Sequence, residues 1–121
     1  MKKSIILRGS LSYDNHPQSF LSNIVNTIRT WFDGEIIIST WEGQEHNIST
    51  SLGIDKIVLT KDPGPGPIQH WKRQVVSAIE GFNASTGDLV LISRPDMLFE
   101  KDIFQFIDTE ELYNKLYNQM F

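Results

Sequence analysis

The sequence predicts an α/β domain in three layers, with a mainly parallel sheet flanked by helices. Short apolar runs of strand length alternate along the chain with segments whose apolar residues recur at helical spacing. This alternation is typical of parallel strands that are joined by helical crossovers. The length of 121 residues fits a single domain, residues 1–121, with one core.

Composition narrows the class of protein. Hydrophobic residues make up 40% of the chain and charged residues 21%, so the chain should fold. A net charge of −4 argues against a nucleic-acid-binding protein, which is usually basic. Cysteine is absent from the sequence, which excludes disulfides, zinc thiolate sites and cysteine nucleophiles and fits a cytoplasmic protein.

The first predicted strand, residues 4–7, ends at Arg8, Gly9 and Ser10. This segment is either a ligand-facing loop, in which glycine lets the backbone approach a ligand closely, or an ordinary strand-to-helix turn. An amphipathic helix follows, with a start signal at residues 14–17 and a glycine, Gly34, past its end. Its apolar face consists of Phe20, Leu21, Ile24, Val25, Ile28, Trp31 and Phe32.

The second and third strands are predicted at residues 35–40 and 54–60. Trp41, Glu42 and Gly43 follow the second strand, and Glu42 is either a functional carboxylate or a solvated loop residue. Residues 44–52 are polar and turn-like. After the third strand, residues 61–67 read Lys-Asp-Pro-Gly-Pro-Gly-Pro, which predicts a loop. This loop lacks the Gly-Lys-Ser/Thr ending of a phosphate-binding P-loop.

The second predicted helix carries a cation near its start. Arg73 and Gln74 fall in its first turns, where positive charge is unfavourable against the helix macrodipole. Arg73 is therefore either placed to meet an anion or is a surface arginine. The apolar face of this helix comprises Trp71, Val75, Ala78, Ile79 and Phe82.

The fourth predicted strand is followed by the most informative candidate site residues of the sequence. Residues 89–92 form a continuous apolar run that we expect to be buried on both faces, and Pro95 stops it. Arg94 and Asp96 then stand at the carboxyl end of a parallel strand, where ligands bind in such sheets. They are either binding residues or two solvated charges in an exit turn. Asp96 is the best candidate for a ligand of Mg²⁺ or Mn²⁺ bridging phosphates.

The C-terminal segment is predicted to be helical. Asp102 is placed to cap a short helix that carries Ile103 and Phe104, and a further helix begins near residue 109 with Leu112 and Leu116 on one side. This tail is a candidate for docking or for contact in a homo-oligomer.

The ends of the predicted strands converge. Right-handed crossovers place Arg8, Trp41, Asp62, Arg94 and Asp96 along one edge of the sheet. The sequence lacks the motifs of three other kinds of site. The three histidines do not have the spacing of a zinc site. The Gly-x-Ser-x-Gly motif of serine hydrolases and the Gly-x-Gly-x-x-Gly motif of dinucleotide-binding domains are absent from the sequence.

Five segments carry a family resemblance when they are taken together and in order. They are Ile6-Leu7-Arg8-Gly9, Ile37-Ile38-Ser39-Thr40-Trp41-Glu42-Gly43, Leu59-Thr60-Lys61-Asp62-Pro63-Gly64, Arg73-Gln74-Val75-Val76-Ser77 and Ser93-Arg94-Pro95-Asp96-Met97. They resemble the WavE lipopolysaccharide-synthesis family, which comprises bacterial glycosyltransferase-like proteins of the GT-A type. Ser-Thr-Trp-Glu-Gly and Lys-Asp-Pro-Gly are the most specific parts of the resemblance.

The resemblance implies a Rossmann-like domain that binds a nucleotide-sugar donor for lipopolysaccharide or capsular polysaccharide synthesis. Arg94 stands where other GT-A enzymes have the first aspartate of a metal-binding Asp-x-Asp, so Asp96 is left to hold Mg²⁺, Mn²⁺ or the donor diphosphate. One metal ligand is thereby missing, and Arg94 is expected to contact phosphate as a fixed cation. The donor-binding residues that the resemblance implies are Arg8, Gly9, Ser10, Asp62, Arg73, Gln74, Arg94 and Asp96.

The family also implies partners and a larger protein. Its members are typically longer, so we expect an N-terminal or truncated portion of a glycosyltransferase whose acceptor-binding half and catalytic base lie elsewhere. The expected partners are a nucleotide-sugar and a polysaccharide or lipid-linked acceptor, with no nucleic acid. The expected location is the cytoplasm, either free or at the periphery of the inner membrane.

Two functions stay open from the sequence. One is donor binding for a glycosyltransferase, and the alternative is a non-catalytic α/β module that binds a nucleotide or a protein. A receiver-type signalling domain is not expected, because Arg8-Gly9-Ser10 stands where such a domain has acidic residues.

Overall fold

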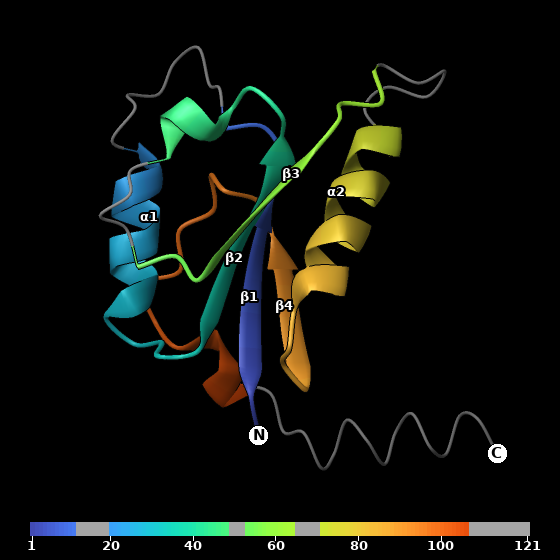
Figure 1. Cartoon of the computed structure of the whole chain (residues 1–121). Helices are drawn as coiled ribbons and strands as arrows, with labels where there is room; N and C mark the ends of the chain where they lie inside the picture. The colour runs from blue at the N-terminus through green and yellow to red at the C-terminus, as the bar shows by residue number, and fades with distance from the viewer. Residues whose placement is uncertain (12–19, 49–52, 65–70, 107–121) are drawn as a thin grey trace, which may run out of the picture.

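The structure, a computed structural model of the chain, describes residues 1–11, 20–48, 53–64 and 71–106. Its described strands form one parallel sheet of β1 (Lys3–Arg8), β2 (Glu35–Trp41), β3 (Lys56–Thr60) and β4 (Leu89–Ser93), in the order β3-β2-β1-β4. Helices α1 (Phe20–Arg29) and α2 (Trp71–Ala84) cover opposite faces of this sheet (Figure 1). The three-layer, Rossmann-like α/β architecture confirms the predicted fold class.

The main core lies between α1 and the sheet. Ile24, Val25 and Ile28 of α1 are fully buried against side chains such as Ile5 and Ile36 of the two central strands. β1 and β2 are nearly continuous apolar runs because a helix on each face and a strand on each side cover them. This packing explains why their positions were predictable from hydrophobicity alone.

Gly34 does not end α1, contrary to the prediction. The helix stops at Arg29, whose guanidinium donates to the main-chain oxygens of Phe32 and Gly34 at 3.3 and 2.7 Å. The backbone of Gly34 is not left-handed. A Cβ atom there would come within 2.7 Å of the Lys3 carbonyl oxygen, so this glycine permits close packing and is not a helix cap.

Helix α2 contacts the sheet through small residues. Ser77 and Gly81 are buried, and the Ser39 hydroxyl donates to the Ser77 carbonyl oxygen at 2.7 Å. A Cβ atom on Gly81 would lie 2.5 Å from Ile6 Cγ2, so glycine is required for this approach. The predicted apolar stripe faces away from the sheet: Trp71, Val75, Ile79 and Phe82 are all exposed.

The prediction that residues 89–92 are buried on both faces is wrong. Among the described strands, β4 has β1 as its partner on one side and lies at the edge of the sheet. Leu89, Val90 and Leu91 are consequently half-buried, and Ile92 is 41% exposed. The fully covered strands are β1 and β2.

Two short 3₁₀ helices complete the described structure. η1 (Glu45–Asn47) lies in the polar stretch after β2, and η2 (Ile103–Phe106) follows Asp102. Asp102 Oδ1 accepts a hydrogen bond from the Phe104 amide at 2.9 Å, which confirms the predicted cap.

The helix-start signal at residues 14–17 and the tail from residue 107, with its predicted oligomer contact, lie outside the described residues. Among the described helices, none combines the length and apolar character that crossing a bilayer requires.

A buried carboxylate, Glu35, joins the elements at the amino edge of the sheet. Its Oε1 atom accepts hydrogen bonds from Ser4 Oγ at 2.8 Å and from the Thr86 amide at 2.9 Å. Its Oε2 atom accepts from Thr86 Oγ1 at 3.1 Å and lies 3.2 Å from Lys56 Nζ. Burial raises the pKa of Glu35, but these hydrogen bonds outweigh it and lower the pKa to about 2.

Candidate functional site

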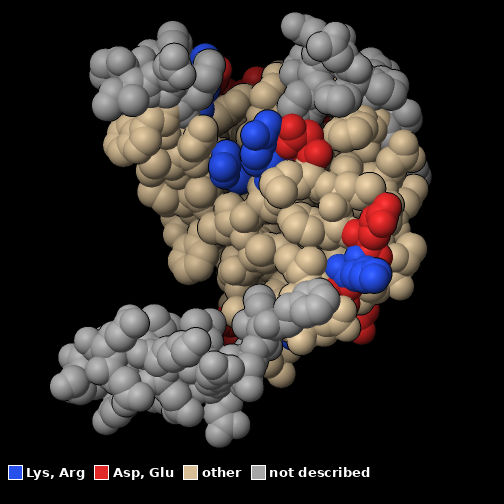
Figure 2. Space-filling view, turned by 180° about the vertical axis from the view of Figure 1, so that it is seen from behind, with Lys and Arg blue, Asp and Glu red and all other residues tan. Residues whose placement is uncertain are grey.

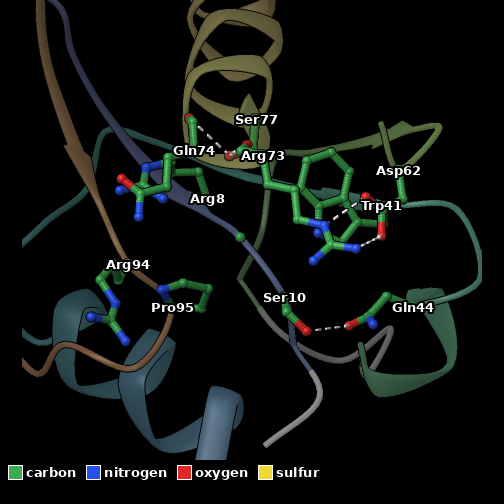
Figure 3. Close-up of a pocket in the computed structure, with 11 residues that line it drawn as sticks. Arg8, Ser10, Trp41, Gln44, Asp62, Arg73, Gln74, Ser77, Arg94 and Pro95 are labelled. Carbon is green, nitrogen blue, oxygen red and sulfur yellow. Dashed lines mark hydrogen bonds and ion pairs between the residues drawn. The ribbon is translucent and has the colours of Figure 1, made fainter. Parts of the chain in front are cut away.

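A cavity of about 540 Å³ opens at the opposite, carboxyl edge of the sheet (Figure 3). The chain runs outward from β1 through β2 to β3 and then returns to the other side of β1 as β4, so the strand order reverses between β1 and β4. Open α/β sheets bind ligands outside the strand ends at such a reversal. Seven of the predicted site residues line this cavity: Arg8, Gly9, Ser10, Asp62, Arg73, Gln74 and Arg94.

The loop after β1 is fixed by its backbone. Gly9 has a φ of 122°, which side-chain-bearing residues rarely adopt. Its amide donates to the Ser39 carbonyl oxygen at 2.9 Å, and its carbonyl oxygen accepts from Thr40 Oγ1 at 2.7 Å. These bonds hold the loop against β2 and place Arg8 and Ser10 at the cavity wall.

Gln44 ties the loop after β1 to the loop after β2. Its Oε1 atom accepts hydrogen bonds from the Leu11 amide at 2.7 Å and from Ser10 Oγ at 3.4 Å. Gln44 was not predicted as a site residue. The available signal was weak, because it is one polar residue in a stretch that reads as an ordinary turn.

Arg73 forms an ion pair with a carboxylate of the protein itself, that of Asp62. Its Nε and Nη2 atoms donate to Asp62 Oδ1 and Oδ2 at 2.8 and 3.1 Å, a bidentate pair that links α2 to the loop after β3. Asp62 Oδ1 also accepts from the Gly64 amide at 2.9 Å. The pair places one carboxylate and one guanidinium on the same wall of the cavity (Figure 3).

Arg8 and Arg94 flank the point where the strand order reverses. β1 and β4 pair in register up to Leu7 and Ser93, so the two arginines occupy the next position on neighbouring strands. Neighbouring strands lie about 4.8 Å apart, so the main-chain positions that carry these two arginines are close together. Arg94 remains 60% exposed, which leaves its guanidinium accessible from the cavity.

Asp96 does not line the cavity. Its Oδ2 atom accepts a hydrogen bond from Arg94 Nη2 at 2.8 Å, so the two charges pair with each other across Pro95 and are not separately solvated. Asp96 Oδ1 is buried and has no hydrogen-bond partner among the described residues. The sequence could not show that Arg94 turns back towards Asp96.

These residues do not fit the divalent metal that the GT-A resemblance implies. Mg²⁺ and Mn²⁺ take about six oxygen ligands in open coordination, with carboxylates among them. One oxygen of Asp96 is already paired with Arg94, and the other is buried, with Asp96 not among the described residues that line the cavity. In the described part of the chain, no group of three or more carboxylate, histidine or cysteine side chains could hold a metal.

The cavity is positively charged although the protein is acidic. Among its described lining residues, three are arginines and one is a carboxylate, whereas the whole chain has a net charge of −4. Figure 2 shows one group of Lys and Arg side chains in the upper part of the rear face, beside an acidic group, and a separate basic group beside acidic side chains lower on the same face. Charge concentrated in a cleft attracts ligands of the opposite sign.

The structure confirms the predicted convergence of strand ends for Arg8, Trp41, Asp62 and Arg94, which share one cavity. Trp41 is itself buried and forms part of the wall. Ser77 of α2 also lines the cavity and was not predicted, because a serine inside a helix gives no signal in the sequence. Glu42 is exposed and is not among the lining residues.

One of the comparisons with known proteins found a match. The family model described as WavE lipopolysaccharide synthesis matches residues 4–120, nearly the whole chain. No curated protein and no solved structure matches.

Proposed function

The chain belongs to the WavE lipopolysaccharide-synthesis family, and we propose that it binds a nucleotide-sugar donor as part of a GT-A-like glycosyltransferase. Membership gives the role in lipopolysaccharide synthesis. The binding of a nucleotide-sugar is our proposal, and the cavity at the carboxyl edge of the sheet supports it.

The observation that carries the proposal is the charge of this cavity. A nucleotide-sugar presents two linked phosphates, and planar guanidinium groups match phosphate oxygens in geometry as well as in charge. Arg73 and Arg94 enter from α2 and from the end of β4, and Arg8 enters from β1. In the proposed complex, Arg73 and Arg94 contact the phosphates, and the loop Arg8-Gly9-Ser10 holds the nucleoside, with the Arg8 guanidinium adding to the positive charge around the phosphates.

A second candidate function is nucleotide binding without turnover. Among the described residues that line the cavity, the one carboxylate is Asp62, and Arg73 engages both of its oxygens. A general base must be able to reach the proton that it removes. The described part of the site is thus better equipped for holding a donor than for transferring its sugar.

Calorimetric titration with UDP-, GDP- and CMP-sugars, with and without Mn²⁺, tests the proposal. We expect at least one donor to release heat and to raise the melting temperature. Arg8→Ala should weaken this binding roughly tenfold, because a charge-assisted contact is lost. Lys72→Ala, an exposed cation of α2 that does not line the cavity, is the matched control and should bind as the wild type does.

The absence of binding for every donor would contradict the proposal. Binding without release of nucleoside diphosphate, with the chain and an acceptor extract together, would favour the second candidate function over the first.

A further inference from the structure

We propose that the diphosphate site works without a divalent cation, with Arg94 in the place of the metal and Asp96 as the residue that positions Arg94. The inference rests on the proposed function for the identity of the ligand, but it concerns a narrower question. It assigns a ligand class, a pyrophosphate group free of metal, and it assigns different roles to the two residues.

The first observation is the pairing of Arg94 with Asp96. The 2.8 Å contact joins residues two apart in sequence, and the buried Pro95 between them restricts the backbone. Asp96 is mostly buried, whereas Arg94 is mostly exposed. The pair therefore combines a mostly buried carboxylate with an exposed guanidinium, and the exposed group is the one that a ligand in the cavity meets.

The second observation is the neighbouring charge. Arg8 is the last residue of β1 and Arg94 directly follows β4, so two arginines stand at the ends of adjacent strands at the strand-order reversal. Asp96 neutralises one of them in part. Together they offer net positive charge at the cavity, with fixed donors that a bare ion lacks.

Asp96 Oδ1 provides the strongest argument for the opposite view, because a buried carboxylate oxygen without a partner is what an empty metal site can leave behind. Two facts decide against that reading. The atom is buried and Asp96 is not among the described residues that line the cavity, so this oxygen is not presented to a ligand there. A metal at the other oxygen would have to displace the guanidinium of Arg94.

The test measures binding of inorganic pyrophosphate and of UDP, GDP and CDP, in EDTA and in excess Mn²⁺. We expect pyrophosphate and at least one nucleoside diphosphate to bind in EDTA, with affinity changed less than about threefold by Mn²⁺. Arg94→Ala should weaken binding in EDTA by roughly tenfold to a hundredfold, and Arg94→Lys by less, because lysine keeps the charge but loses the planar fork.

Two further variants separate positioning from metal binding. Asp96→Asn should weaken binding severalfold in EDTA and in Mn²⁺ alike, because it loosens Arg94 in both conditions. Arg94→Asp creates two carboxylates two residues apart; it should abolish binding in EDTA and restore part of it when Mn²⁺ is present. Circular dichroism of each variant checks that it has folded.

The outcomes distinguish this inference from the proposed function. If nucleotide-sugars bind to the wild type in Mn²⁺ but not in EDTA, the inference is overturned while the proposed function stands. If pyrophosphate binds in EDTA and no nucleotide-sugar binds in either condition, the metal-free anion site stands while the proposed function fails. Lack of pyrophosphate binding in EDTA overturns the inference whatever the donors do.

Discussion

A charged side chain is buried at one end of the sheet, and charged side chains face a cavity at the other. At the amino edge, Glu35 is buried, and its carboxylate is surrounded by hydrogen-bond donors from Ser4, Lys56 and Thr86. At the carboxyl edge, Arg8 and Arg94 leave neighbouring strands towards an open cavity. The difference teaches that a charge satisfied inside the protein serves stability, whereas a charge facing a cavity is available to a ligand.

The largest expected effect lies at the amino edge. Glu35→Ala should lower the free energy of unfolding by roughly 2–4 kcal/mol, because Ser4, Thr86 and Lys56 lose a common acceptor at a buried site. Urea unfolding at neutral pH measures this loss. Glu42→Ala, which removes an exposed glutamate, is the control and should change stability by less than about 0.5 kcal/mol. Equal losses for the two variants would remove the contrast between the two ends of the sheet.

Acid should reproduce part of that loss without a mutation. The pKa of Glu35 is lowered from 4.5 to about 2 in the folded protein, so its contribution is complete above pH 4.5 and is lost as the pH falls towards 2. Other carboxylates also titrate there, so the informative quantity is the difference in unfolding free energy between wild type and Glu35→Gln. This difference should shrink by roughly 1–3 kcal/mol between pH 6 and pH 2. A constant difference would show that Glu35 is not held ionised by its partners.

Gly9→Ala should have a smaller effect on stability and a visible one on binding. The added Cβ would have space, with Pro95 Cδ at 3.8 Å, but the φ of 122° is strained for alanine. We expect a loss of roughly 1–2 kcal/mol in the free energy of unfolding. Pyrophosphate affinity should fall as well, because Arg8 precedes the distorted residue. Unchanged affinity would mean that the backbone of Gly9 does not position Arg8.

The smallest expected effect on stability belongs to Arg8→Ala. It should change the free energy of unfolding by no more than about 0.5 kcal/mol, since the side chain faces the cavity. Pyrophosphate affinity should fall roughly tenfold in the same protein. A large loss of stability with unchanged affinity would reverse the assignment of the two ends and make the carboxyl edge structural.

Much of the fold follows from the sequence, because β1, β2 and α1 are covered on their apolar faces and therefore show clear periodic patterns. Helix α2 shows the limit of this approach: spacing shows that Trp71, Val75, Ile79 and Phe82 share a face, but it does not show that this face points away from the sheet. The buried face of α2 is marked instead by Ser77 and Gly81, which carry little hydrophobic signal. The position of β4 at an edge also depends on strand order, which no local pattern contains.

The candidate site was predictable where it depends on strand ends and not where it depends on side-chain conformation. Arg8, Asp62 and Arg94 stand at or just after the ends of parallel strands, so topology alone brings them together. Gln44 contributes through one side-chain hydrogen bond to the Leu11 amide, which spacing does not reveal. Asp96 was assigned to the cavity because it follows the same strand, but it pairs with Arg94 and is not among the described lining residues.

The close seating of α2 has a mechanical consequence. With Gly81 against Ile6 and with the Ser77 carbonyl bonded to Ser39, the helix cannot slide along the sheet or tilt without breaking these contacts. Arg73 and Gln74 belong to the same helix, one to two turns before Ser77 and Gly81. Their position relative to the strand ends is therefore set before any ligand binds. The wall of the cavity that α2 forms therefore keeps its position relative to the sheet. Adaptation to ligands of different size must come from the loops that face it.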